Sequence, residues 1–293
     1  MARNDPSRLK ILFPNYVPGA QLTGGQWAAG DLSLDALKDL DAGRVARTQG
    51  VDPSGTVLDI TFDRLRTIGG LAVLNHNLSV AAKMVLQGFR DEARRDPVYN
   101  GEGRAVEVYP VAYSRGQIRF GETNWWSRKP LAENLDRVRT LALLILPAQI
   151  RARYWRLRFV DPTNAAGFLD IGKVYLGSLF DPPHNYAYGA TLTTMDESRM
   201  SQALSGFRDY DRRGKRRRIA VTFQNMKERA EFSRWFDLLA DAGITEEMIV
   251  IRNPADTINL HRTTICATLR EASALEQSVY LRMGVGLVFE EAL

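Results

Sequence analysis

The sequence predicts a mainly β protein made of two β-sandwich domains, and three observations support this. Apolar and polar residues alternate with period two over long stretches, turn-forming residues separate these stretches, and few segments have helical spacing. The chain has 293 residues, of which 45% are hydrophobic and 25% charged, so each of two domains can bury its own core. These values exclude a disordered chain, a collagen-like repeat and a coiled coil.

Period-two alternation identifies the strands, because successive side chains of a strand face opposite sides of the sheet. It is clear in Thr56–Phe62 and Tyr154–Val160, and longest in Val279–Phe289, where apolar odd-numbered positions predict one strand from Ser278 to Phe289. We expect antiparallel strands with one wet face. Further strands are predicted at Leu9–Phe13, Leu71–Leu74, Lys83–Phe89, Ala105–Tyr109, Asp170–Leu176, Ile219–Phe223, Met248–Arg252 and Thr263–Leu269.

One helix is predicted with defined ends, over Met226–Ala242. Asn225 is its expected N-cap, Glu228 completes a capping box, and Gly243 follows its last residue. An apolar stripe on this helix is expected to pack against a sheet, and consists of Phe232, Trp235, Phe236 and Leu239.

Two features describe the organisation of the rest of the chain. Leu131–Leu146 ends before Pro147, and its apolar end fits either a helix or a buried strand. Asp181–Asn185 contains two consecutive prolines, which cannot join a sheet ladder. We therefore predict a boundary there, with domains over residues 1–183 and 184–293.

The sequence lacks the residues that several functional classes of protein require. The single Cys266 and three scattered histidines predict no disulfide, no metal site and no cofactor. We expect no secretory signal and no membrane insertion, because no apolar stretch is long enough. Motifs of nucleotide-binding proteins and a Gly-x-Ser-x-Gly elbow are absent, so we predict a protein that is not an enzyme.

The loop Leu74–Ser79 could present a histidine at the end of a strand. It places His76 between Asn75 and Asn77, residue types that bind ligands through hydrogen bonds. The same residues suit a turn in which asparagine and serine side chains bond to nearby backbone groups. The sequence favours the turn and leaves a ligand site open.

Two adjacent tryptophans, Trp125 and Trp126, lie in a polar loop between Gly121 and Pro130. Neighbouring residues of an extended segment point to opposite sides, so at most one of the two enters a core. An exposed indole suits a protein interface or the face of a sugar. Three alternatives remain open: a subunit interface, packing within the domain, and a platform for a glycan.

The basic residues of the chain, whose net charge is +5, are concentrated in one loop: Arg212, Arg213, Lys215, Arg216, Arg217 and Arg218. Such a run can attract the phosphates of a nucleic acid. It can also be a solvated loop, or a basic rim that matches acidic residues on a neighbour. We favour these alternatives over direct nucleic-acid recognition, because no aromatic residues are interleaved with the basic ones.

The first half of the chain resembles a galactose-binding-like (discoidin-like) jelly roll. The resemblance rests on Leu58–Phe62, Ile68–Leu74, the Asn75–Ser79 loop, and the stretches Ala152–Phe159 and Ile171–Gly177. Together with the Asn-Trp-Trp loop, this arrangement is similar to virion proteins encoded among the tail genes of long, flexible-tailed bacteriophages. Ligand-binding members of the jelly-roll family present aromatic and polar residues at one end of the sandwich, which implies a site at the Asn75–Ser79 loop.

The second half resembles the β-sandwich with one helix of tail-tube and distal-tail proteins, by the order of its strands and the helix from Met226. This resemblance implies a structural subunit of a phage tail tip or baseplate, made in the host cytoplasm. Its expected partners are copies of itself in a ring, other tail proteins, and DNA passing transiently through the tail lumen beside the basic loop.

Two further functions remain as alternatives to the structural subunit. One is a carbohydrate-binding adhesin that contacts host surface glycans through Trp125 or Trp126 and the Asn75–Ser79 loop. The other is a cell-wall hydrolase, for which we expect no activity.

Overall fold

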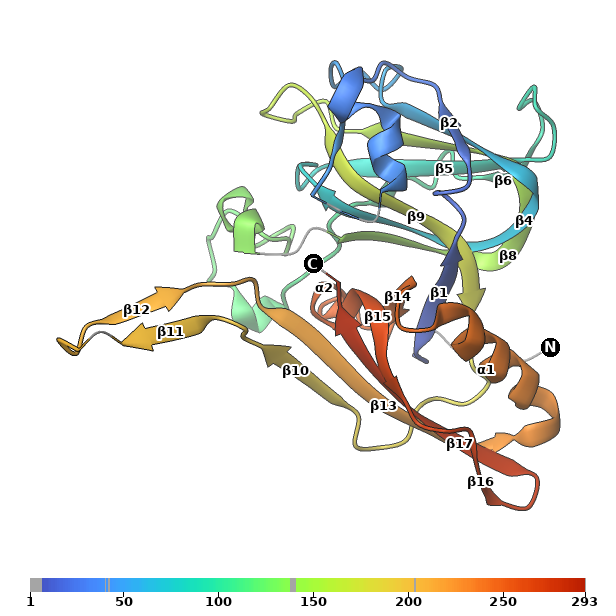
Figure 1. The fold of residues 1–293 in the computed structure, drawn as a ribbon. Helices are drawn as coiled ribbons and strands as arrows, with labels where there is room; N and C mark the ends of the chain where they lie inside the picture. Colours follow the sequence, from blue (N-terminus) through green and yellow to red (C-terminus); the bar gives the residue numbers. More distant parts are fainter. Residues whose placement is uncertain (1–6, 40, 42, 138–140, 203, 293) are drawn as a thin grey trace. The chain divides into compact units, whose positions relative to one another are not determined.

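Strands are the main regular secondary structure of the chain in the computed structural model (Figure 1), which describes residues 7–39, 41, 43–137, 141–202 and 204–292. The chain divides into two units. The first unit contains Leu12–Phe180 and Ala255–Arg262, and the second contains Asp181–Pro254, Thr263–Leu293 and the segment that ends at Ile11. The main division therefore falls at Phe180/Asp181, and the sequence prediction put it at residues 183/184. Strand β1 (Lys10–Asn15) begins in the second unit and ends in the first.

The first unit is built around two long strands, β4 and β8, in a sheet of order β9-β4-β8-β5-β6. Three short strands pair at its margins: β2 with β4, β3 with β9, and β7 with β5. The bounds are β2 (Gln21–Thr23), β3 (Ala46–Arg47), β4 (Val57–His76), β5 (Lys83–Phe89), β6 (Pro97–Asn100), β7 (Val106–Glu107), β8 (Leu141–Val160) and β9 (Asp170–Phe180).

β4 joins two segments that the sequence predicted as separate strands. Leu58 and Ile60 face the core in its first half, and Leu71 and Val73 face the same core in its second half. The inward positions change from even to odd because the pairing of β4 with β8 shifts register between residues 61 and 66 and again between residues 68 and 70. The bulged strand can thus line both sides of one core.

The open segment Leu131–Leu146 contains a strand and not one continuous helix. Residues 132–137 form a 3-10 helix, and β8 begins at Leu141. Residues 138–140 lie outside the described part. The apolar end of the segment alternates between buried and half-buried residues because it pairs with the second half of β4.

The second unit contains a sheet of order β10-β13-β17-β15-β14, with β16 paired to β17, and a separate two-stranded sheet, β11-β12. Its bounds are β10 (Thr191–Met195), β11 (Arg199–Gln202), β12 (Arg208–Asp211), β13 (Arg216–Lys227), α1 (Glu228–Ala242), β14 (Glu247–Ile251), β15 (Thr264–Ala272), β16 (Glu276–Val279) and β17 (Arg282–Glu291). The short helix α2 (Leu260–Thr263) precedes β15. No helix of the described residues is both long and apolar enough to cross a membrane.

The predicted C-terminal strand is a hairpin. β16 ends at Val279, Leu281 has a φ of 58° in the turn, and β17 starts at Arg282. The prediction of one strand from Ser278 was wrong because the alternation continues through the turn. The alternating inward residues of β17 are confirmed, since Met283, Val285, Leu287 and Phe289 are all buried.

Helix α1 begins later than predicted and buries a different face. β13 continues to Lys227, which is the N-cap, and Asn225 lies in a bulge of that strand with a φ of 59°. Trp235 packs on Phe223 of the sheet, with ring centroids 4.7 Å apart. The buried residues are Glu231, Trp235, Leu238 and Ala242. The predicted stripe was therefore wrong for Phe232 and Phe236, which are 46% and 54% exposed.

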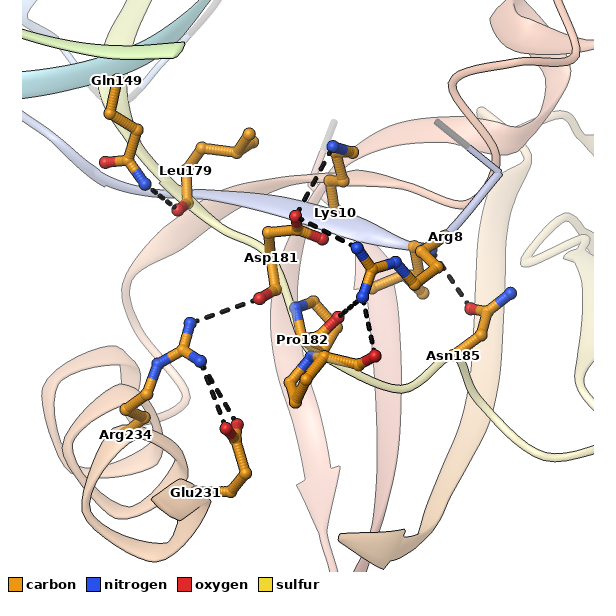
Figure 2. A network of polar contacts seen from close by, with 11 residues as sticks. Arg8, Lys10, Gln149, Leu179, Asp181, Pro182, Asn185, Glu231 and Arg234 are labelled. Atoms are coloured by element: carbon orange, nitrogen blue, oxygen red, sulfur yellow. Dashed lines mark hydrogen bonds and ion pairs between the residues drawn. The ribbon is translucent and has the colours of Figure 1, made fainter. Parts of the chain in front are cut away.

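A polar network holds Asp181, the residue at which the chain enters the second unit (Figure 2). Its carboxylate lies 3.7 Å from the guanidinium of Arg8 and 3.8 Å from the ammonium of Lys10. Arg8 also donates hydrogen bonds to the carbonyls of Pro182 (3.0 Å) and Pro183 (2.7 Å). Because the prolines cannot donate to a strand, side-chain donors satisfy the carbonyls of this segment.

Candidate functional site

The two predicted loops of the first unit meet at one end of its sheet. Leu74, near the end of β4, pairs with Leu141 at the start of β8, so the turn after β4 and the segment before β8 lie at the same end. The ammonium of Lys129 bridges them, because it donates to the carbonyl of Val80 (3.4 Å) and pairs with Glu107 at 3.0 Å. The structure thus brings together segments that are about fifty residues apart in sequence.

A buried carboxylate organises the turn after β4. Asp161 is fully buried, and it accepts hydrogen bonds from the backbone N–H (2.7 Å) and the hydroxyl (2.5 Å) of Ser79. The side-chain amide of Asn164 donates a third hydrogen bond to it, at 3.0 Å. These donors satisfy a charge that would otherwise be costly to bury. Asp161 is therefore a structural anchor of the turn, and no local sequence pattern indicates this long-range contact.

Asn77 is also occupied within the protein. Its amide donates to the carbonyl of Phe168 (3.1 Å), and its side-chain oxygen accepts the N–H of Asp170 (2.8 Å). Asn75 is exposed, with a left-handed φ of 48°. Of the two asparagines predicted as ligand residues, Asn75 is exposed near the end of β4, while Asn77 is partly buried and joins the turn to the start of β9.

His76 lies in the core. It is 6% exposed, and its ring meets the edge of the Tyr109 ring at a centroid distance of 5.7 Å and an angle of 73°. Burial lowers the pKa of His76 to about 4, against a smaller opposing effect of the nearby Asp161 charge. Burial likewise raises the pKa of Tyr109. His76 is therefore neutral at physiological pH and out of reach of a surface ligand.

The exposed feature at this end is the aromatic loop, residues 119–129. Trp126 and Phe120 are each 86% exposed, whereas Trp125 is half-buried. The Phe120 and Trp125 rings meet edge to face, with centroids 5.4 Å apart. Both tryptophans were predicted as site residues from the sequence, and Phe120 was not. The sequence feature that could have indicated Phe120 is its position between the polar Arg119 and the turn residue Gly121, in the same loop as the tryptophans.

The aromatic loop is held by its own hydrogen bonds. Asn124 is buried. Its side-chain amide donates to the backbone carbonyl of Lys129 (3.0 Å), and its backbone carbonyl accepts the N–H of Arg128 (2.7 Å). The N–H of Trp125 donates to the carbonyl of Glu122 at 3.0 Å. A closed loop of this kind presents Trp126 with little conformational freedom left to lose on binding.

A second surface feature was not predicted, a stacked ion pair at the edge of the same turn. The guanidinium of Arg47 donates two hydrogen bonds to Asp170, at 2.7 and 2.9 Å, and lies 4.0 Å from the centroid of the Phe168 ring. The hydrogen bonds to Asp170 raise the pKa of Arg47. Asn77 holds both Phe168 and Asp170, so the polar turn supports this pair from behind.

The basic run of the second unit is largely neutralised by carboxylates of the same unit. Arg217 binds Glu291 through its backbone N–H (2.9 Å) and its guanidinium (2.5 Å), and Arg218 pairs with Glu290 at 2.9 Å. Arg216 lies 3.7 Å from Glu290. Lys215 pairs with Asp196 at 3.2 Å, and Arg213 with Asp211 at 3.1 Å. Only Arg212 has no charged partner among the described residues.

This pairing changes what the basic loop can do. Glu290 and Glu291 are 8% and 4% exposed, so three arginines are committed to buried carboxylates. Their charge is compensated within the fold, and little of it is left to attract phosphate. The net charge of the run, read from sequence alone, therefore overstates the positive field at this surface.

The second unit also has an open hollow of about 450 Å³ between β13, β16 and β17. Gly284 and Gly286 form part of its floor, and Gln224, Glu276 and Arg282 are among its polar walls. Across the described residues, no three His, Cys, Asp or Glu side chains converge as a metal-binding group. The hollow thus offers hydrogen-bonding groups and one charge of each sign.

Comparison with known protein families and with curated proteins gives no match. Solved structures that match just over half of the chain include several carbohydrate-binding modules, all at low TM-scores and low sequence identity. A mutant lectin-binding domain of lectinolysin complexed with Lewis b matches with a TM-score of 0.37 and 13% identity, over 57% of this chain and 98% of that one. A fucose-binding module from Streptococcus pneumoniae (TM-score 0.35, 12% identity) covers 56% of this chain and 94% of its own. A family 32 module from Streptococcus pneumoniae EndoD (TM-score 0.35, 14% identity) covers 56% and 99%.

Proposed function

We propose that this protein binds carbohydrate through the aromatic loop of its first unit, without catalysis. The observation that carries the proposal is the indole of Trp126, which is 86% exposed on a loop closed by Asn124. Exposed tryptophan is unfavourable in water, and its flat apolar face suits the C–H face of a pyranose ring. Phe120, equally exposed on the same loop, adds a second apolar surface.

Polar groups of the same loop end supply the hydrogen bonds that a sugar needs. Arg128 follows the tryptophans in the same loop and is partly buried, and Asn75 is exposed near the end of β4. The ionisable groups at this end of the first unit support binding without catalysis. The carboxylate of Asp161 is already bound by three donors, and His76 is buried and neutral.

The test is a glycan array probed with the purified full-length protein. We expect binding to a subset of glycans and its loss in Trp126→Ala, at least tenfold in affinity by calorimetry. Tyr188→Ala is the matched control, because Tyr188 is a fully exposed aromatic residue of the second unit. A blank array, or equal binding by Trp126→Ala and the parent protein, contradicts the proposal.

A second candidate is the structural subunit of a phage tail tip, located in the virion. It is favoured by apolar residues exposed on the second unit, such as Phe232 and Phe236 of α1 and Phe207 in the β11–β12 hairpin. Surfaces of this kind are expected in a subunit that docks to other proteins. Antibody labelling of intact virions, with the tail tip imaged by electron microscopy, tests this candidate. Unlabelled tails contradict it.

A further inference from the structure

The β11–β12 hairpin extends from the second unit without packing on it. We call residues 199–202 and 204–213 the arm. All eight strand residues are exposed, and β11 and β12 pair only with each other among the described residues. An isolated two-stranded hairpin is marginally stable in water at best. We therefore expect a partner that packs on the arm to stabilise it.

The apolar strand residues of the arm lie on one of its faces. Met200 and Tyr210 are cross-strand partners, so both side chains lie on one face of the hairpin, and they are 55% and 52% exposed. Gln202 and Arg208 share this face, and the opposite face carries the polar pairs Arg199–Asp211 and Ser201–Asp209. Phe207, 71% exposed, directly precedes β12. An apolar face left in water on a protruding hairpin is a docking surface.

A second apolar surface lies on the outer side of α1. We call Phe232 and Phe236 the helix patch; they are 46% and 54% exposed. The two phenylalanine rings stack one helical turn apart, with centroids separated by 5.9 Å and an angle of 16° between their planes. They form one continuous apolar strip along the helix.

The charges around the two surfaces are complementary. The arm carries four arginines, at 199, 208, 212 and 213, against two aspartates, at 209 and 211. The C-terminal half of α1 and the loop after it carry Asp237, Asp241 and Glu246, and no basic residue occurs between Trp235 and Ile251. The negative end of the helix dipole adds to this acidic field. The N-terminal half of α1 also carries Arg229 and Arg234, against Glu228 and Glu231, so the acidic field lies at the C-terminal end of the helix. The basic arm thus matches the acidic end of α1 that follows the helix patch.

One molecule cannot bring its own arm onto its own helix patch. Figure 1 draws the β11–β12 hairpin and α1 at opposite ends of the second unit. Two complementary surfaces on different faces of one chain make a head-to-tail contact, which leaves one free arm and one free patch at the ends of every open assembly. Such contacts close into rings or grow as filaments.

We propose that the arm of one molecule docks on the helix patch of a second copy of this chain. Met200, Tyr210 and Phe207 cover Phe232 and Phe236, while the arginines of the arm face the acidic end of α1. The inference is independent of carbohydrate binding. It deepens the second candidate function, because it names the surfaces through which a tail subunit self-associates.

The test is self-association of the full-length protein, measured without sugar by sedimentation velocity over a range of concentrations. We expect assembly that weakens with added salt. Met200→Ser/Phe207→Ser in the arm and Phe232→Ser/Phe236→Ser in the patch should each weaken it at least tenfold. An equimolar mixture of these two variants should form a one-to-one dimer and nothing larger, since only one intact arm and one intact patch remain to meet.

Two controls separate this surface from other causes of lost assembly. Trp126→Ala and Tyr280→Ser should assemble as the parent protein does, because neither residue belongs to the arm or the helix patch. Charge reversal gives a second pair of variants that does not expose or remove apolar groups. Arg208→Glu/Arg212→Glu and Asp237→Arg/Asp241→Arg should each weaken assembly, and their combination in one chain should restore it.

A parent protein that stays monomeric at every concentration overturns the proposal, as does unchanged assembly in the arm and patch variants. Failure of the two variants to pair when mixed also overturns it, because it shows that the arm and the patch do not contact each other. Binding of the arm to a glycan or to another protein, with no self-association, overturns the proposal as well, because the arm then has a partner other than a second copy of this chain. Carbohydrate binding by Trp126→Ala is measured in a separate experiment, so the outcome of the self-association test does not depend on whether the protein binds carbohydrate.

Discussion

The carboxylate of Asp161 accepts both the backbone N–H and the hydroxyl of Ser79, a residue 82 positions earlier in the chain. Through this contact, the end of β8 fixes the turn that follows β4. The turn in turn holds Phe168 and Asp170 through Asn77. The loop end of the first unit is therefore a rigid polar framework, beside which the aromatic loop is anchored by Lys129.

Asp161→Asn should destabilise the first unit by about 2 kcal/mol, because an amide replaces one acceptor oxygen and leaves a buried donor of Ser79 without its partner. Urea denaturation followed by tryptophan fluorescence measures the change. Asp35→Asn is the matched control, since that carboxylate is 82% exposed and should change stability by less than about 0.5 kcal/mol. Equal effects of the two substitutions would show that Asp161 does not anchor the turn.

The stability of the first unit should fall as the pH drops from 6.5 towards 4. Burial lowers the pKa of His76 from 6.5 to about 4, so the unfolded chain binds a proton in this window before the folded one does. The stabilisation is complete above pH 6.5, and His76 accounts for a loss of about 3 kcal/mol by pH 4.

The His76→Phe variant should show a flatter dependence of thermal stability on pH between 6.5 and 4, since phenylalanine keeps a ring against Tyr109 but cannot titrate. His184→Gln provides the comparison, because His184 is exposed. A slope in His76→Phe as steep as in the parent protein would falsify this assignment.

The two aromatic faces of α1 should respond differently to truncation. Trp235→Ala removes a fully buried indole packed on Phe223 and should cost about 3–5 kcal/mol of the second unit's unfolding free energy. Phe236→Ala, at a 54% exposed position, should cost about 1 kcal/mol or less. Thermal unfolding of dilute samples, in which self-association is negligible, distinguishes them. A larger cost at Phe236 would mean that the helix buries the face predicted from sequence.

Glu291→Gln should destabilise the second unit by about 3 kcal/mol, because it leaves the guanidinium of Arg217 without its buried counter-charge. The control Glu276→Gln changes an exposed carboxylate and should be close to neutral. Denaturation by urea compares the two variants. If Glu291→Gln is neutral and also increases binding to single-stranded DNA, Arg217 is available to phosphate and the pairing described here is unimportant.

The sequence by itself determined where most strands lie and which of their residues face inward. β5 occupies the predicted residues 83–89, and β17 buries the predicted residues Met283, Val285, Leu287 and Phe289. The end of α1 at Gly243 was also predicted from sequence. These features depend on local periodicity and on single residues that end a helix, and both can be read without knowing the rest of the fold.

Tertiary structure decided the features that depend on a distant partner. The register shifts that join two predicted strands into β4, the face that α1 buries, the burial of His76 and the pairing of Arg217 with Glu291 all need residues far away in the chain. α1 has more apolar residues than one face can bury, so packing on Phe223 selected Trp235 and left Phe232 and Phe236 outside. A local pattern specifies which side chains are apolar, whereas contact between elements determines which of them lose their water.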